Sequence, residues 1–105
     1  MQHVKILDTS NQVVANAHVS SNAGQWKGSV VLEAMPLPMQ RLFSELEEVV
    51  EGQMFSFLDD VENRIAALNL RAVLPDGVDA YFSLLHIYPT TGAISFTLAK
   101  SPALA

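Results

Sequence analysis

Polar and apolar residues alternate along the first third of the chain with the period of a β-strand. The alternation covers residues 3–7, 13–20 and 25–33, and clusters of turn-forming residues lie between these segments. The first two segments are typical of a hairpin, because a short turn separates two runs of period two. The third segment, which begins around Trp26, predicts another strand.

The period changes to about 3.6 residues in the middle of the chain. A first apolar stripe consists of Met39, Leu42, Phe43, Leu46, Val49 and Val50, and a second consists of Leu58, Val61, Ile65 and Leu68. The first stripe predicts a helix that ends near Gly52. The second predicts another helix, with Ser56 as N-cap, Asp59 three residues on and Asn69 at its end. A single bent helix is the alternative to two helices.

The last third returns to period two. The turn sequence Pro75-Asp76-Gly77 follows a short apolar run, a long strand ends at Tyr88, and a last strand begins at Ala93. The element order is therefore βββ-αα-βββ. It predicts one α+β domain over residues 1–105, with a mainly antiparallel sheet of five to six strands and two consecutive helices packed on one face.

The last two strands carry apolar residues on both faces. If Tyr88 faces Ala93 across a four-residue loop, one face pairs Ile87 with Ile94, Leu85 with Phe96 and Ser83 with Leu98. The other face carries Phe82, Leu84, His86 and Tyr88 opposite Ala99, Thr97, Ser95 and Ala93. Leaving about 300–400 Å² of such a face bare would cost about 8–10 kcal/mol relative to burial. We therefore expect a cover over it.

Three covers are open: a second copy of the chain, its own N-terminal hairpin in a barrel-like sheet, or a ligand or foreign protein. Twofold homodimers are the commonest soluble assembly, so a second copy is favoured. The predicted interface consists of Phe82, Leu84, His86, Tyr88, Ser95 and Thr97. The function predicted from this surface is that of a non-catalytic protein-interaction or regulatory module. Its partner would be a second copy of the chain, which would form a homodimer, or another protein.

A small-molecule-binding domain is the alternative function. Its apolar pocket would lie between the helices and the sheet. The residues expected to line it are Trp26, Phe55, Phe57 and His86.

The charge distribution argues against a nucleic-acid partner. The chain carries a net charge of −5, and residues 39–68 hold two basic and seven acidic side chains, so this segment alone accounts for the whole excess. The simplest explanation is a solvated, acidic helix face. Phosphate backbones would meet this acidic layer, and the sequence has no lysine or arginine cluster to receive them.

The sequence contains no arrangement typical of a catalytic, metal or cofactor site. There is no cysteine, the five glycines are scattered, and His3, His18 and His86 have no metal-ligand spacing. His86 would lie opposite Ser95, where we predict a cross-strand hydrogen bond rather than catalysis. An enzyme that uses His86 or His18 as its base is the least favoured function. Without cysteines, a leader or a membrane span, a cytoplasmic location fits best.

Overall fold

The computed structural model describes residues 2–99, which form six strands and two α-helices in the predicted order βββ-αα-βββ. The strands are β1 (Gln2–Leu7), β2 (Val13–Asn22), β3 (Gln25–Val31), β4 (Arg71–Val73), β5 (Asp79–Tyr88) and β6 (Ala93–Leu98). The helices are α1 (Leu37–Glu51), the short 3₁₀-helix η1 (Phe55–Phe57) and α2 (Leu58–Ala66). The α+β class and the two separate helices are confirmed.

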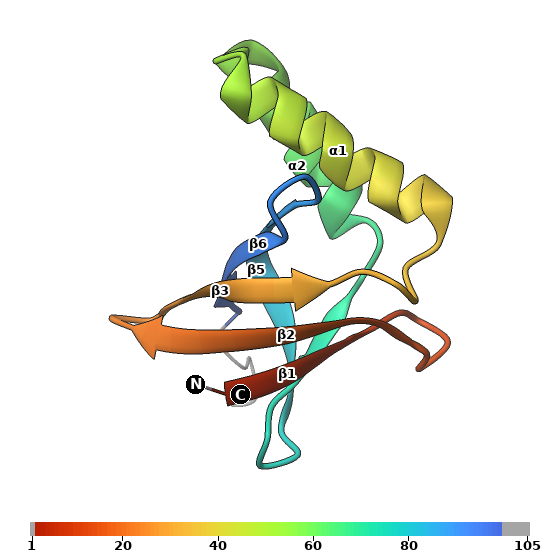
Figure 1. Ribbon diagram of the computed structural model, residues 1–105, viewed down its shortest axis with the longest axis vertical. Coiled ribbons are helices and arrows are strands. Elements are labelled where there is room, and N and C mark those ends of the chain that lie inside the picture. Colours follow the sequence, from red (N-terminus) through yellow and green to blue (C-terminus); the bar gives the residue numbers. More distant parts are fainter. Residues whose placement is uncertain (1, 100–105) are drawn as a thin grey trace.

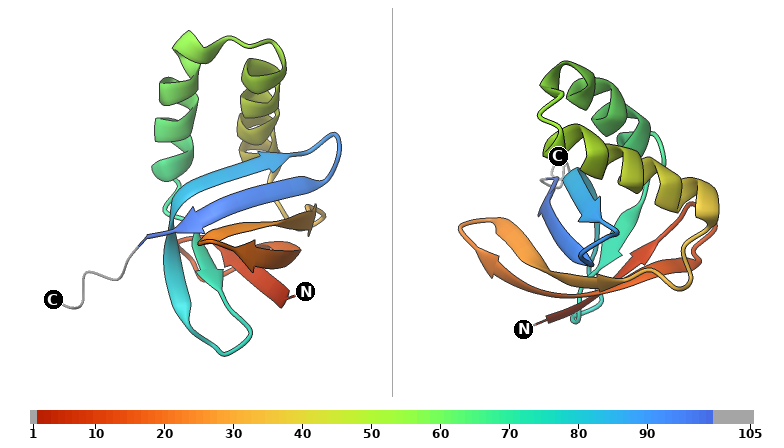
Figure 2. Two further views of the ribbon diagram at one scale, coloured as in Figure 1. Left: turned by 90° about the vertical axis from the view of Figure 1, so that its left-hand side faces the viewer. Right: turned by 45° about the horizontal axis from the view of Figure 1, so that its top comes forward.

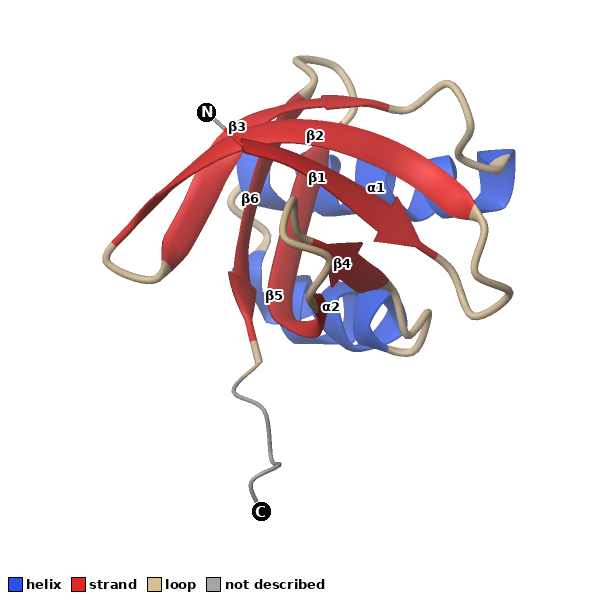
Figure 3. Cartoon of the chain, turned by 90° about the horizontal axis from the view of Figure 1, so that it is seen from below, coloured by secondary structure: helices blue, strands red, loops and turns tan. Residues whose placement is uncertain are grey.

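The antiparallel sheet closes into a barrel with the strand order β1-β2-β3-β6-β5-β4. The three-residue strand β4 completes the closure by pairing with both β1 and β5. Figure 3 shows β1, β2 and β3 crossing in front of β5 and β6, with both helices behind these two strands. Both helices lie on one side of the barrel and contact β5 (Figure 1).

The interior beneath β1, β2 and β3 is filled by branched and small apolar residues. Its fully buried members from β1 and β2 are Val4, Ile6, Ala15, Ala17 and Val19. Strand β3 approaches β2 very closely, because a Cβ atom at Gly28 would lie 1.9 Å from the backbone oxygen of His18. Glycine is therefore required at this point of the β2–β3 ladder.

The helices add their apolar stripes to the same core. Phe43, Leu46 and Val49 of α1 and Val61 and Ile65 of α2 are buried in one cluster with the barrel residues. An ion pair also joins the two helices to each other. The guanidinium of Arg64 in α2 donates to both carboxylate oxygens of Glu45 in α1, at 3.0 and 2.7 Å. This hydrogen bond lowers the pKa of Glu45 below its ordinary value.

The predicted helix ends are partly right. Helix α1 ends at Glu51 with Gly52 as its C-cap, as predicted. Asn69 has a left-handed φ of +54°, but it lies beyond the end of α2, whose last residue is Ala66 and whose C-cap is Ala67. Ser56 is not the N-cap of α2, so that prediction was wrong. The chain enters α2 directly from η1, and the residue before the helix is Phe57, without a side-chain cap.

The register of the last hairpin is confirmed near its loop and shifts further away. Tyr88 pairs with Ala93, His86 with Ser95 and Leu85 with Phe96, as predicted, but Phe82 and not Ser83 pairs with Leu98. A β-bulge at Ser83 inserts one extra residue and so reverses the face of everything before it. The placement of Phe82 on the outer face was therefore wrong. Its ring meets that of Phe96 edge to face, with centroids 5.0 Å apart.

Candidate functional site

The chain's own helices cover part of the sheet face over which we expected a second copy, the N-terminal hairpin, or a ligand or foreign protein. His86 and Tyr88 lie where α1 and α2 contact β5, and both side chains are half-buried. His86 Nε2 lies 2.7 Å from Glu62 Oε2 of α2, and His86 Nδ1 lies 3.1 Å from the Tyr88 hydroxyl. A carboxylate only accepts, so Nε2 carries the hydrogen, and in the neutral ring the Tyr88 hydroxyl donates to Nδ1.

Burial raises the pKa of Tyr88 above its ordinary value, and the negative charges of Glu47 and Glu62 raise it further. The phenol therefore keeps its proton and remains a donor to His86. The hydrogen-bonded chain from Tyr88 through His86 to Glu62 ties β5 to α2.

A second carboxylate ties α1 to the loop between β5 and β6. Glu47 is only 5% exposed, and its Oε1 accepts from the Thr90 hydroxyl at 2.8 Å and from the Thr90 backbone N–H at 3.2 Å. The expectation of a uniformly solvated acidic helix face was wrong at this position. The helical spacing of apolar residues could not reveal the burial of Glu47, because its partner Thr90 lies in a loop 43 residues further along the chain.

The predicted hydrogen bond between His86 and Ser95 does not form. The two residues are opposite each other in the ladder, but both ring nitrogens of His86 bind Tyr88 and Glu62 instead. His3 and His18 stack on each other, with ring centroids 5.1 Å apart. Within residues 2–99, no group of three or more histidine, cysteine, aspartate or glutamate side chains could hold a metal ion.

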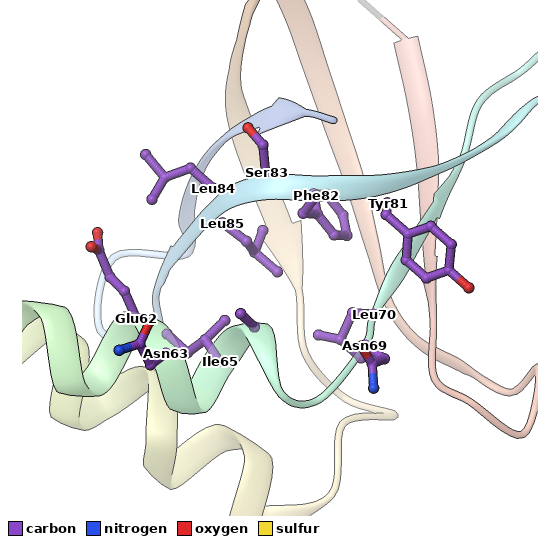
Figure 4. Close-up of a pocket in the computed structure, with 11 residues that line it drawn as sticks. Glu62, Asn63, Ile65, Asn69, Leu70, Tyr81, Phe82, Ser83, Leu84 and Leu85 are labelled. Atoms are coloured by element: carbon purple, nitrogen blue, oxygen red, sulfur yellow. The ribbon is translucent and has the colours of Figure 1, made fainter. Parts of the chain in front are cut away.

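A groove of about 400 Å³ lies between α2 and β5 (Figure 4). Ile65, Leu70, Phe82 and Leu85 contribute its apolar part. The remaining lining residues are Glu62, Asn63, Ala66, Asn69, Tyr81, Ser83 and Leu84. In Figure 4, Glu62 and Asn63 lie toward one end of the groove, and Tyr81 and Asn69 lie toward the other. The groove is thus apolar in its middle and polar at both ends.

The four residues predicted to line a ligand pocket do not come together. Trp26 stacks on Phe96, with centroids 5.8 Å apart, and so packs against the core. Phe55 and Phe57 lie in the connection between the helices, and His86 reaches the groove only through its bond to Glu62. A pocket between helix and sheet exists where we expected one, but residues from 62–70 and 81–85 line it.

The predicted interface is also divided. Phe82 is half-buried and packs against Phe96, and His86 and Tyr88 contact the helices, whereas Leu84 is 39% exposed. Ser95 and Thr97 are half-buried, and Thr97 Oγ1 lies 2.7 Å from Ser83 Oγ. The open part of this face is therefore narrower than the sequence suggested.

The most exposed group of large apolar side chains lies elsewhere. Met54, Phe55 and Phe57 are 42%, 59% and 58% exposed; we call these three residues the aromatic tip. They lie in the connection between α1 and α2, at the end of the molecule away from β1 and β2 (Figures 1 and 2). The sequence had singled out both phenylalanines, but for an inward-facing pocket.

Comparison with known proteins adds no relative. No protein-family model, curated protein sequence or solved structure matches the chain. No helix within residues 2–99 has the length and apolar character needed to cross a membrane.

Proposed function

We propose that this protein is a non-catalytic protein-interaction module that binds its partner through the aromatic tip. The observation that supports this proposal is the exposure of Met54, Phe55 and Phe57 within four consecutive positions. Single exposed apolar residues are common on monomers, but adjacent large ones are typical of an interaction site. Phenylalanine and methionine are also enriched at protein interfaces.

The surroundings of the aromatic tip favour a basic partner. Glu51 precedes it, and Asp59 and Asp60 follow it in the first turn of α2; all three are exposed. An apolar pocket with lysine or arginine residues around it would match both the apolar side chains and this charge. A second copy would bring like charges together around its own aromatic tip, so the tip favours a foreign protein.

A comparative pull-down tests this proposal. The wild type, the double variant Phe55→Ser/Phe57→Ser and the control Leu37→Ser serve as baits in an extract of the source organism. Leu37 is a suitable control because it is 64% exposed but lies at the start of α1, outside the aromatic tip. We expect a protein that the wild type and the control retain and the double variant loses.

The captured protein must then be purified and must bind the wild type directly. The double variant should bind it at least about tenfold more weakly, which corresponds to a loss of about 1.4 kcal/mol in binding free energy. Circular dichroism and thermal unfolding establish that the double variant is folded. If the double variant retains every protein that the wild type binds, the aromatic tip is not the binding surface.

Homodimerisation through the outer face of β5 and β6 is a second proposal, supported by the exposure of Leu84. Sedimentation equilibrium of the wild type and of Leu84→Glu tests it. A dimer that Leu84→Glu dissociates supports it, and a wild type that is monomeric at all concentrations rejects it.

A further inference from the structure

We propose that the groove between α2 and β5 binds a small organic cation with an apolar body. This site is separate from the aromatic tip, so the inference does not depend on the proposed protein partner. It rests on the size of the groove, on the side chains that line it, and on the one charge among the described residues of its lining.

The groove has the size and lining of a small-molecule site. Its volume of about 400 Å³ lies within the usual range for ligand pockets. Ile65 and Leu70 on one side and Phe82 and Leu85 on the other are large apolar residues that line the groove (Figure 4). Ile65, Leu70 and Leu85 are at most 5% exposed, so a hydrocarbon chain or ring would contact mainly the half-buried Phe82 and the outer edges of the other three. This part of the site would bind by removing apolar surface from water.

The charge in the groove selects a cation. Glu62 is the one charged residue among the described residues that line it. Its Oε2 binds His86, whereas its Oε1 has no hydrogen-bond partner within residues 2–99. The carboxylate is held in place by His86 and is only partly exposed, with 26% of its side chain accessible. A positioned carboxylate with a free acceptor atom can bind an ammonium group through a charge-assisted hydrogen bond.

The other end of the groove offers an aromatic ring and two polar groups. Tyr81 is 58% exposed and lies at the end away from Glu62 (Figure 4). Its ring offers a flat surface for stacking, and its hydroxyl and the Asn69 carboxamide offer hydrogen bonds. The groove thus favours an elongated molecule with its positive charge at one end.

Anions are disfavoured by the same residues. Neither lysine nor arginine occurs among the described groove residues, so a phosphate or carboxylate would find no positive side chain. It would instead approach Glu62. Nucleotides and fatty acids are therefore poor candidates, although their apolar parts would fit.

Three probes of equal chain length test this inference: n-heptylammonium, heptan-1-ol and heptanoate. Each is titrated into the protein labelled with nitrogen-15, and the backbone amide shifts are followed by NMR. We expect heptylammonium to shift the amides of residues 62–70 and 81–85 in a saturable manner. Heptanol should bind at least about tenfold more weakly, because it cannot form the charge-assisted hydrogen bond to Glu62. A tenfold difference in affinity corresponds to about 1.4 kcal/mol. Heptanoate should bind less than heptanol.

Glu62→Gln tests the role of the carboxylate. It retains an oxygen that can accept from His86 but has no charge, so the affinity for heptylammonium should fall to that for heptanol. Asp59→Asn is the matched control, because Asp59 is an exposed carboxylate on α2 that does not line the groove. It should leave the preference for the ammonium unchanged.

Ala66→Phe tests whether the probes bind in the groove, and it leaves the Glu62 carboxylate in place. This second variant keeps the inference testable if Glu62→Gln does not fold. Ala66 lines the groove and is exposed, so a larger side chain can occupy the groove without disturbing the core. Binding of all probes should be lost, whereas Ala67→Phe, which alters the exposed neighbour outside the groove, should retain it. Equal binding of heptylammonium and heptanoate, or no saturable shift of groove amides up to millimolar concentrations, would overturn the inference.

Discussion

The barrel side of the molecule and its helical side are built on different principles. Under β1, β2 and β3 the buried residues are small or branched and apolar, and β2 and β3 approach so closely that Gly28 has no room for a Cβ atom. Where α1 and α2 meet β5, the contacts include the buried carboxylate of Glu47 and the bonds from His86 to Tyr88 and Glu62. The first region is apolar and closely packed, whereas the second adds hydrogen bonds to an apolar core that both regions share.

The aromatic tip and the groove are both on the helical side. The aromatic tip joins the two helices, and the groove separates α2 from β5. A polar contact lies at one end of the groove, because Glu62 of α2 accepts a hydrogen bond from His86 of β5. Both of the sites proposed above at the aromatic tip and the groove therefore lie on the helical side, and neither lies under β1, β2 and β3.

Gly28→Ala should have the largest effect on stability, because the barrel side tolerates no added volume. The new methyl carbon would lie 1.9 Å from the His18 carbonyl oxygen, and both strands would have to move apart. We expect a loss of more than about 3 kcal/mol in the free energy of unfolding, measured by urea denaturation. Ser29→Ala, at the exposed neighbouring position, is the control and should change it by less than about 0.5 kcal/mol.

A Gly28→Ala protein with wild-type stability would show that the β2–β3 contact is loose. The close packing that distinguishes the barrel side from the helical side would then have no effect on stability at Gly28.

Glu47→Ala should have an intermediate effect and tests the helical side. It removes both hydrogen bonds to Thr90 and leaves space in a buried position, so we expect a loss of about 1–3 kcal/mol in the free energy of unfolding. Glu48→Ala is the matched control, because Glu48 is the exposed next residue of α1. Glu47→Gln, which retains an acceptor, should lose less than Glu47→Ala. Equal stability of the Glu47→Ala and Glu48→Ala variants would assign Glu47 no role in holding α1 to the loop.

The sequence predicted what depends on local period and turn chemistry. The alternating residues and the turn at Pro89–Gly92 were enough to give the order of the elements along the chain and the pairing of Tyr88 with Ala93. The bulge at Ser83 was not predictable, because one inserted residue leaves the apolar pattern almost unchanged while it turns Phe82 from the outer face toward Phe96.

Closure of the barrel and the groove depend on contacts between distant segments. Strand β4 has only three residues, too few to show a period, yet it joins β1 to β5. The groove requires the register of β5 and the path of the chain from α2 to Leu70, neither of which has a sequence motif. The same is true of Glu47, whose burial depends on where the β5–β6 loop lies.

Ionisation of Tyr88 should give the smallest effect, confined to alkaline pH. Its pKa is raised in the folded protein by burial and by Glu47 and Glu62, so the unfolded chain loses this proton at a lower pH than the folded chain does. The resulting stability is fully present below about pH 10, the ordinary pKa of tyrosine, and is lost as the pH rises through the higher folded value. We therefore expect the free energy of unfolding of Tyr88→Phe, measured by urea denaturation at a series of pH values, to decline less steeply above about pH 10 than that of the wild type. Tyr81→Phe is the control, because Tyr81 is exposed, and it should decline as the wild type does. If Tyr88→Phe declines with pH as steeply as the wild type, the phenol does not share its environment with the two carboxylates, and the polar contacts that distinguish the helical side reach no further than His86.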